Sequence, residues 1–193
     1  MKIPVVGFDP SLTHWGIASG ELDLSTGFLD TLILKLIEPE KIDHKQVRQN
    51  SEDLFVADQL AKPALAAARA AKAVFVEVPV GSQSARAMAS YGVCVGILGA
   101  IRAEGIPLIE VTATESKLSF TGNKNASKRQ MINQAVSLYP SAKFPRYERS
   151  GKSFKKGEIM NTAEHVADAI AAIHAGVSTP MFQNLMRLYQ VNP

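Results

Sequence analysis

The feature that most constrains the fold is the order of the short apolar runs along the chain. Three of them, at 3–8, 15–19 and 29–37, follow one another with short, turn-like connections. Strands so close in sequence pair most simply as an antiparallel meander. Two further apolar runs, at 73–78 and 106–111, each follow a segment of helical composition, which predicts parallel βαβ units.

The segments between and after these runs predict the helices. Helical composition spans 44–72, 85–104, 127–138 and 161–175, with a short helix in the tail 180–193. Pro63 marks a kink or the first turn of a second helix, and Ser127 is suited to cap the helix that follows it. The polar stretch 112–127 is expected to be a loop that connects the fifth predicted strand to the helix after it. The sequence thus predicts an α/β fold, a single domain over 1–193 with a mixed five-stranded sheet flanked by helices on both faces.

Composition excludes several classes of protein. With 46% apolar and 20% charged residues, the chain is globular rather than disordered or fibrous. Its one cysteine, Cys94, excludes a disulfide framework and predicts a reducing compartment, the cytoplasm. There is no apolar run of about 18 residues to span a membrane. The apolar run before Asp9 is too short for a secretory signal peptide.

The positive charge is concentrated in one part of the chain. Residues 111–160 hold ten Lys or Arg side chains and three acids, although the net charge of the whole chain is only +3. This asymmetry indicates either a polyanionic partner or a solvated basic surface. Within it, 140–160 is rich in Pro, Gly, Ser and bases and is predicted to be a flexible basic loop.

Two acidic residues stand at the ends of buried strands. Asp9 directly follows the first apolar run, and Glu77 interrupts the fourth. A buried carboxylate is unfavourable unless it is paired or bound to a metal. The alternatives are an Asp-Pro turn for Asp9 and a solvated strand edge for Glu77.

The last clear helix adds a third acidic position. His165 and Asp168 are three residues apart and share one face of a helix that is otherwise rich in Ala, Val and Ile. His165 is either part of a site or a hydrogen-bonded core histidine. Glu164 lies three residues after Asn161, a spacing typical of a capping box, and is interpreted as mainly structural.

Three carboxylates and one imidazole form a donor set suited to Mg²⁺ or Mn²⁺. Two such ions could activate a water and stabilise the leaving oxygen of a phosphodiester. The sequence contains no zinc-finger spacing, Walker A loop or G-x-S-x-G motif.

Three segments resemble RuvC-type Holliday junction resolvases. The stretch 5–16 (VVGFDPSLTHWG) is similar to the first strand and turn of that family. Val76-Glu77, with the helix that follows, resembles its second acidic strand, and 165–171 (HVADAIA) resembles its C-terminal acidic helix. The segments occur in the family's order over about 3–175.

The resemblance implies an RNase H-like fold, a homodimer, and a crossover junction endodeoxyribonuclease that nicks two strands of a four-way DNA junction symmetrically. The metal-binding catalytic set it implies is Asp9, Glu77, His165 and Asp168. Lys117 and Lys128, in the loop and helix after the fifth strand, match positions that contact DNA phosphate. Lys124 and Arg129 cluster beside them, where helix N-terminal N–H groups also favour phosphate.

Some features depart from the family pattern. No aromatic residue occurs near Val80, where the family often places one at the junction centre, and 140–160 is longer and more basic than usual. These differences leave open a relaxed nuclease that acts on several branched DNAs, as small phage-type relatives do.

Other functions also remain open. One is a structural DNA-binding protein on a decayed nuclease fold, and another is a nuclease related to those that trim ribosomal RNA precursors. An actin-like or sugar-kinase ATPase would need later Asp-Gly-Gly phosphate loops, which are absent from the sequence. A candidate dimer surface is the helix 85–104, with its glycines and with Tyr91, Val95 and Leu98 beside them.

Overall fold

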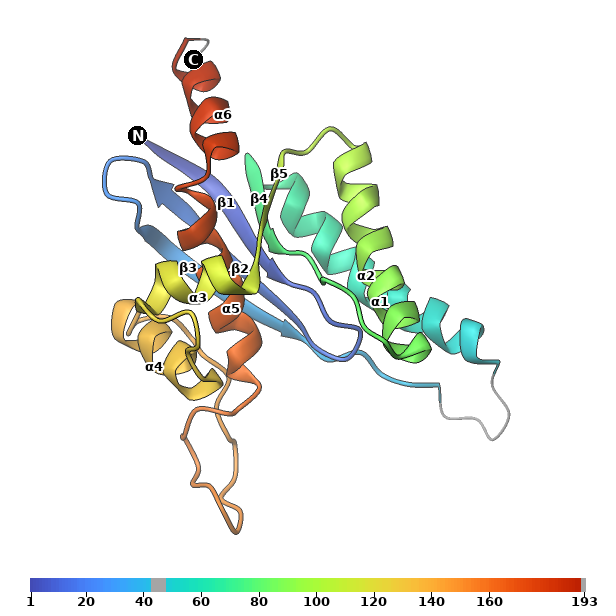
Figure 1. Cartoon of the computed structure of the whole chain (residues 1–193). Helices are drawn as coiled ribbons and strands as arrows, with labels where there is room; N and C mark the ends of the chain where they lie inside the picture. The colour runs from blue at the N-terminus through green and yellow to red at the C-terminus, as the bar shows by residue number, and fades with distance from the viewer. Residues whose placement is uncertain (43–47, 192–193) are drawn as a thin grey trace.

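The computed structural model describes residues 1–42 and 48–191, which form a five-stranded sheet in the order β3-β2-β1-β4-β5 (Figure 1). The strands are β1 (Lys2–Asp9), β2 (Trp15–Asp23), β3 (Leu29–Ile37), β4 (Ala73–Glu77) and β5 (Leu108–Val111). The first three pair antiparallel, whereas β4 pairs parallel with both β1 and β5. The predicted mixed sheet is confirmed, and the carboxyl ends of β1, β4 and β5 lie at one edge.

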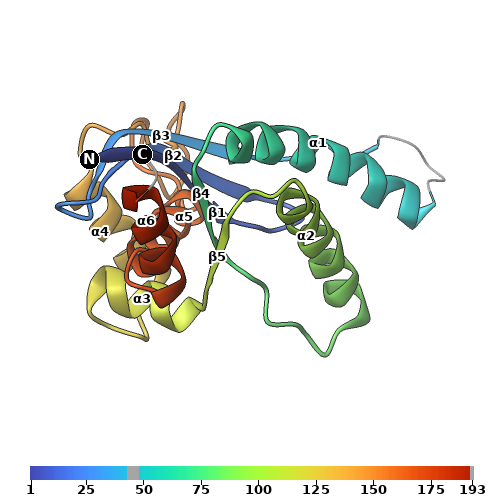
Figure 2. The same cartoon turned by 90° about the horizontal axis from the view of Figure 1, so that it is seen from above.

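Helices cover both faces of the sheet (Figure 2). One layer contains α1 (Gln49–Arg69) and α2 (Ala85–Ala103). The other contains α3 (Ala113–Thr121), α4 (Lys128–Leu138), α5 (Ala163–Gly176) and α6 (Pro180–Val191). Each layer encloses its own apolar core against the sheet. Within the described residues, no helix is long and apolar enough to cross a bilayer.

The helices agree with the predicted positions in most places. α1 runs without interruption through Pro63. The predicted start of this helix, 44–47, lies outside the described residues. Ser127 caps α4 as expected, because its hydroxyl accepts from the N–H of Gln130 while the Gln130 side chain accepts from the N–H of Ser127.

α3 was not predicted, and it changes the position of Lys117. The stretch expected to connect elements contains this nine-residue helix, so Lys117 lies on a helix and not in a loop. Thr112 and Glu115 form a capping box at its start, and Gly122 ends it in the left-handed conformation with φ of 74°. The T-x-x-E spacing was therefore a helix signal in the sequence.

Two glycines allow α5 to lie directly on the sheet. A Cβ at Gly7 would stand 2.0 Å from the carbonyl oxygen of Ala169, and a Cβ at Gly16 would stand 2.0 Å from that of His165. α5 is also buried along most of its length and packs against all five strands as well as α3 and α4. The glycines therefore determine how closely the acidic helix approaches β1 and β2.

The Gly16→Ala variant tests this contact. Because the obstructing atom is backbone, we expect the substitution to lower the free energy of unfolding by about 1–3 kcal/mol in urea titrations, as overpacking does. The matched control is Gly99→Ala on α2, where a Cβ meets nothing within 4 Å. That change should be neutral or stabilise by up to about 1 kcal/mol through helix propensity. Equal effects of the two variants would contradict the close approach.

Candidate active site

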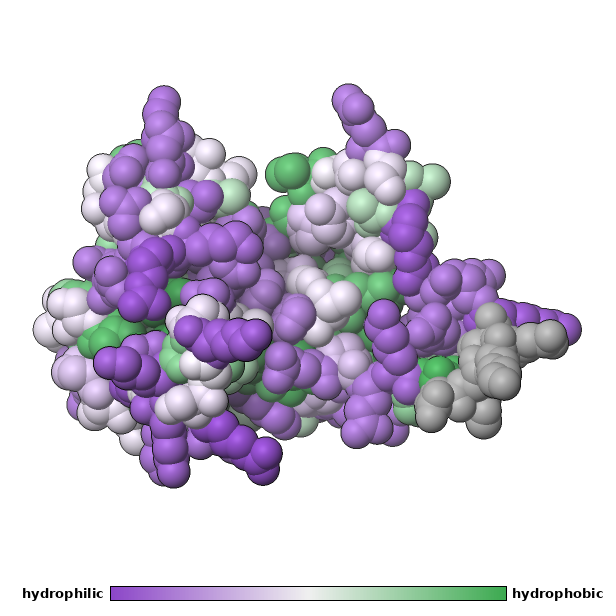
Figure 3. All heavy atoms as spheres, turned by 90° about the horizontal axis from the view of Figure 1, so that it is seen from below, coloured by the Kyte–Doolittle hydropathy of each residue, from purple (hydrophilic) through white to green (hydrophobic). Residues whose placement is uncertain are grey.

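The four predicted metal ligands lie around one pocket. Asp9, Glu77, His165 and Asp168 all line a cavity of about 250 Å³ at the carboxyl edge of the sheet. This is the end of the molecule seen from below in Figure 3, where a hollow separates two lobes and hydrophilic side chains cover much of the surface. Residues from three separate stretches of sequence thus form a single concave acidic site.

Strand alternation brings the two strand carboxylates to the same side. Val6 and Phe8 of β1 belong to the core under α1 and α2, whereas Val5 belongs to the core under α5. Successive side chains alternate between faces, so Asp9 is directed toward α5. The same alternation along β4 directs Glu77 there, and the parallel register places the ends of the two strands side by side.

Asp9 and His165 are joined directly. The Nδ1 of His165 lies 2.6 Å from Oδ2 of Asp9. The His14 ring stacks on His165 with centroids 5.0 Å apart and an interplanar angle of 4°. Burial alone would lower the pKa of His165, but the hydrogen bond and charge of Asp9 raise it above its ordinary value. His165 is therefore part of the pocket wall, held between Asp9 and His14, and not a core histidine.

The other two carboxyl groups are shifted toward the protonated form. Burial, and then the nearby charge of Asp9, raise the pKa of Glu77 to about 7. Burial raises the pKa of Asp168 to about 8, with the charges of Asp9, Glu77 and Glu164 adding to the shift. The pocket therefore holds more negative charge than its own cations neutralise.

The donor chemistry fits a divalent cation. Carboxylate oxygens and one imidazole are suitable ligands for Mg²⁺ or Mn²⁺, and a cation would stabilise the ionised carboxylates against the burial and the acidic neighbours that raise the two pKa values. In the part of the chain that the structure describes, no three His, Cys, Asp or Glu side chains converge on one point as ligands. The fit therefore rests on the residue types around the pocket and on their charge.

Two of the four predicted DNA-binding residues reach the pocket. Lys117 and Lys128 line it, and the Nζ of Lys128 lies 2.7 Å from Oε1 of Glu164. Lys124, shortly before α4, and Arg129, in the first turn of α4, are exposed and are not among the lining residues.

The interpretation of Glu164 as a helix cap was wrong. α5 begins after Thr162, which has helical dihedral angles and no side-chain capping bond, and Asn161 is not the N-cap. Glu164 instead lines the pocket and pairs with Lys128. The partner, Lys128, is 36 residues away in sequence, so local spacing could not reveal it.

Ser116 is a pocket residue that the sequence analysis missed. It is only 1% exposed, and its hydroxyl has no hydrogen-bond partner among the described residues. A buried hydroxyl without a partner is unfavourable. Ser116 is among the residues that line the pocket, next to Lys117 on α3, although its hydroxyl oxygen is itself buried. The capping box at Thr112 was the signal that could have predicted the helix carrying it.

The Asp168→Asn variant tests how much stability is lost when this buried carboxyl group ionises among its acidic neighbours. The folded-state pKa of about 8 lies above that of the unfolded chain, so folding is favoured at low pH and loses stability as pH rises from about 4 to 8. Asn resembles the neutral acid and cannot ionise. In the metal-free protein we expect the variant to melt above wild type at pH 8 and to match it near pH 4.

Glu115→Gln is the control, because folding lowers the pKa of Glu115 whereas it raises that of Asp168. Hydrogen bonds from the Thr112 backbone and side chain lower the pKa of Glu115, so its removal should reduce the melting temperature at neutral pH. If Asp168→Asn also lowers the melting temperature at pH 8, ionisation of Asp168 does not destabilise the folded protein, and the raised pKa is contradicted.

Comparison with known proteins supports the fold. No protein-family model and no curated protein sequence matches the chain. Among solved structures, Thermus thermophilus RuvC in complex with a Holliday junction substrate aligns with a TM-score of 0.61 and 16% identity, covering 96% of each chain. A second T. thermophilus RuvC structure aligns with a TM-score of 0.55 and 17% identity over 95% of this chain and 96% of that one. The chain therefore has the RuvC fold, of the RNase H-like type that the resemblance implied.

Proposed function

We propose that residues 1–193 form one nuclease domain that cleaves Holliday junctions, and other branched DNA, by paired nicks in a divalent-metal-dependent phosphodiester hydrolysis. The observation that supports the proposal is the pocket itself, which Asp9, Glu77, His165 and Asp168 all line. The solved neighbour bound to a Holliday junction supports branched DNA as the substrate class. We place the reaction in the cytoplasm, in keeping with a single buried cysteine.

The proposed metal ligands are the four residues of this set. Bound Mg²⁺ or Mn²⁺, as two ions per site, supplies Lewis-acid activation of water and charge stabilisation at a phosphodiester. Asp9 holds the His165 ring through Nδ1, and His14 stacks against its face, so the ring has a defined orientation before substrate arrives.

The two lysines in the pocket wall are proposed to bind DNA phosphate. Lys117 and Lys128 place two ammonium groups at the acidic pocket, where they can bind the phosphate of the strand to be cut. Lys128 must then exchange its contact with Glu164 for phosphate. Lys124 and Arg129, exposed nearby, are proposed to bind phosphates farther along the strand.

Carboxylate substitution tests the assignment of the catalytic set. In Asp9→Asn and Asp168→Asn we expect cleavage of a synthetic four-way junction to fall by about 10²–10³-fold, as when one electrostatic catalytic group is removed. Binding should be retained, because phosphate contacts come mainly from Lys and Arg. Cleavage in Mg²⁺ or Mn²⁺ and gel-shift binding measure the two effects.

Glu115→Gln, which alters an acid outside the pocket, should cut normally. Wild-type cleavage rates in both pocket variants would reject the assignment. Junction binding by a wild-type protein that cuts nothing in either metal would favour the non-catalytic, structural alternative.

A homodimer is the proposed assembly, since two matched nicks need two sites related by the two-fold symmetry of the junction. The exposed side of α2 is a candidate interface. Its Gly92, Gly96 and Gly99 have nothing near their Cβ positions, and Val95 is 45% exposed. Leu98 is buried against its own subunit and cannot contribute to the interface. α1 and α2 also line a largely apolar groove of about 570 Å³ beside these glycines.

Sedimentation tests this interface. We expect wild-type protein to sediment as a dimer of 20.8 kDa chains at micromolar concentration. Gly96→Glu places a charge on the proposed interface and should give a monomer that makes single nicks. Met181→Glu, a similar change at an exposed position on α6, should remain dimeric. A wild-type monomer with and without junction DNA would exclude paired nicking.

A further inference from the structure

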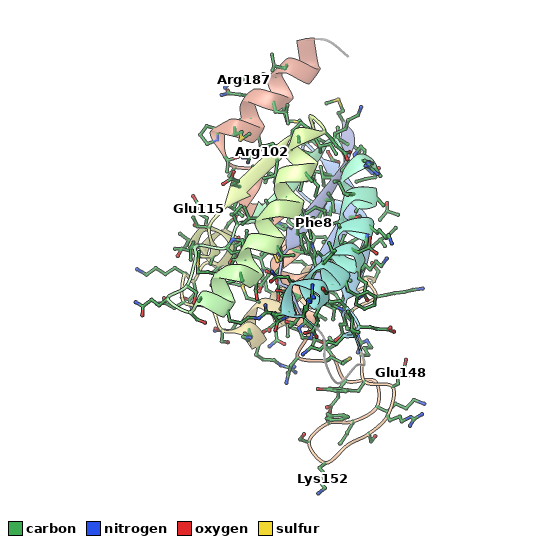
Figure 4. All side chains as sticks on the ribbon, turned by 90° about the vertical axis from the view of Figure 1, so that its right-hand side faces the viewer. Phe8, Arg102, Glu115, Glu148, Lys152 and Arg187 are labelled. Carbon is green, nitrogen blue, oxygen red and sulfur yellow. The ribbon has the colours of Figure 1, made fainter. Side chains whose placement is uncertain are left out.

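The segment between α4 and α5 is folded into a hairpin, which we call the basic hairpin (Pro145–Met160). Its strands are joined by hydrogen bonds from Met160 N to Pro145 O at 3.0 Å and from Tyr147 N to Glu158 O at 2.9 Å. An isolated β-bridge links Arg146 and Ile159. In Figure 4, Lys152 marks the tip, which projects well beyond the helices.

Side-chain contacts give the basic hairpin a defined shape. The rings of Tyr147 and Phe154 stack with centroids 3.8 Å apart and an interplanar angle of 12°. Gly151 N donates to Phe154 O at 2.9 Å, and a Cβ at Gly151 would stand 2.4 Å from the Phe154 ring. The Ser150 hydroxyl accepts from Lys156 N at 3.0 Å. A projection with its own contacts loses less conformational freedom on binding than an unstructured loop does.

The charge of the basic hairpin is not neutralised. It carries five bases and two acids, and one acid, Glu158, accepts from the N–H of Lys155. In residues 1–42 and 48–191, none of the five bases forms an ion pair. On α1 and α2 the pattern is the opposite, since four bases are each paired with an acid: Lys62, Arg69, Arg86 and Arg102. Unpaired positive charge is therefore concentrated on the projection.

The basic hairpin is anchored beside the catalytic pocket. Its last residue, Met160, precedes the pocket residue Glu164 by four positions, and Met160 O accepts from Ala163 N at the start of α5. Figure 1 shows it extending from the end of the molecule at which α5 begins. A ligand that occupies the pocket and continues outward on this side would meet it.

We infer that the basic hairpin is a second DNA-binding element, which binds a double-stranded arm of the substrate outside the cleavage pocket. This rests on the proposed function, in which the pocket holds the strand to be cut. Each side of the hairpin is about seven residues long and reaches up to about 20 Å. Over that length a duplex presents phosphate charges spaced by about 1.7 Å along its axis.

A duplex fits the basic hairpin better than an acidic protein does. From 147 to 156, the only large apolar side chains are Tyr147 and Phe154, and they are stacked on each other. No apolar anchor of the kind that dominates protein interfaces is left on this stretch. Apart from Glu148, the remaining side chains offer positive charge and hydroxyl groups, which suit phosphate and sugar contacts.

The test neutralises the basic hairpin and leaves the pocket intact. The variant changes Arg149, Lys152, Lys155 and Lys156 to Gln. The control changes four bases that lie outside the hairpin and the pocket and have no ion pair among the described residues, namely Lys35, Lys41, Lys72 and Arg187. Binding to a four-way junction and to linear duplex is measured in Ca²⁺ between about 50 and 200 mM salt, where counterion release dominates.

We expect the hairpin variant to flatten the slope of log affinity against log salt by about 3–4, since each lost phosphate contact contributes about 0.9. The control should keep the wild-type slope. At saturating protein in Mg²⁺, the hairpin variant should cut junctions at the wild-type rate within about twofold. An unchanged slope, or a slope change equal to that of the control, overturns the inference.

A second variant separates shape from charge. Phe154→Ala keeps every base and removes the stacked pair, so it should weaken duplex binding at low salt without changing the slope. Thermal melting identifies any loss of the core fold. Binding of poly-glutamate to wild type but not to the hairpin variant, with equal duplex binding by both proteins, would indicate an acidic-protein partner and overturn the duplex assignment.

The outcomes also separate this inference from the proposed function. A wild-type protein that cuts no junction, together with a flattened slope in the hairpin variant, rejects the nuclease and retains the DNA-binding hairpin. A wild-type protein that cuts junctions, together with an unchanged slope, rejects the hairpin alone.

Discussion

The close seating of α5 on β1 and β2 is the contact on which the rest of the site depends. Gly7 and Gly16 leave room for backbone carbonyl groups of α5 where any side chain would collide. At this short distance, His165 on the first turn meets Asp9 at the end of β1. Asp168, one turn later, then faces the same pocket. Two residues without side chains thus position three of the four residues of the proposed catalytic set.

The pocket combines acidic groups at its centre with basic groups around it. Burial and mutual repulsion raise the pKa of Glu77 to about 7 and that of Asp168 to about 8. Lys117 and Lys128 stand in the wall, and the basic hairpin extends outward from the start of α5. The surrounding bases attract a polyanion, and the central acids attract a cation. This is the electrostatic pattern that the proposed nuclease needs.

The fold is shared with RuvC at 16% identity because the architecture depends on few specific residues. Alternation of apolar side chains along β1 and β4 is enough to separate the two cores, and the short connections enforce the antiparallel meander. The segment from Pro145 to Met160 lies outside both the sheet and the named helices. It touches the core mainly through the partly buried Ile159, and its stacked Tyr147 and Phe154 rings lie outside both core clusters.

Local periodicity, and polar residues within apolar segments, were enough to predict the strands, most helices and the four residues of the proposed catalytic set. The sequence also contained the signal for α3, the Thr112–Glu115 capping box. Three features became visible only in the folded structure. They are the hydrogen bond from Lys128 to Glu164, the stacking of His14 on His165, and the buried hydroxyl of Ser116, which has no hydrogen-bond partner among the described residues. Asp9 and His165 are 156 positions apart, and contacts of this kind arise from how α5 packs on the sheet. They could not be predicted from spacing, because local sequence specifies which face a side chain occupies but not which distant residue will lie opposite it.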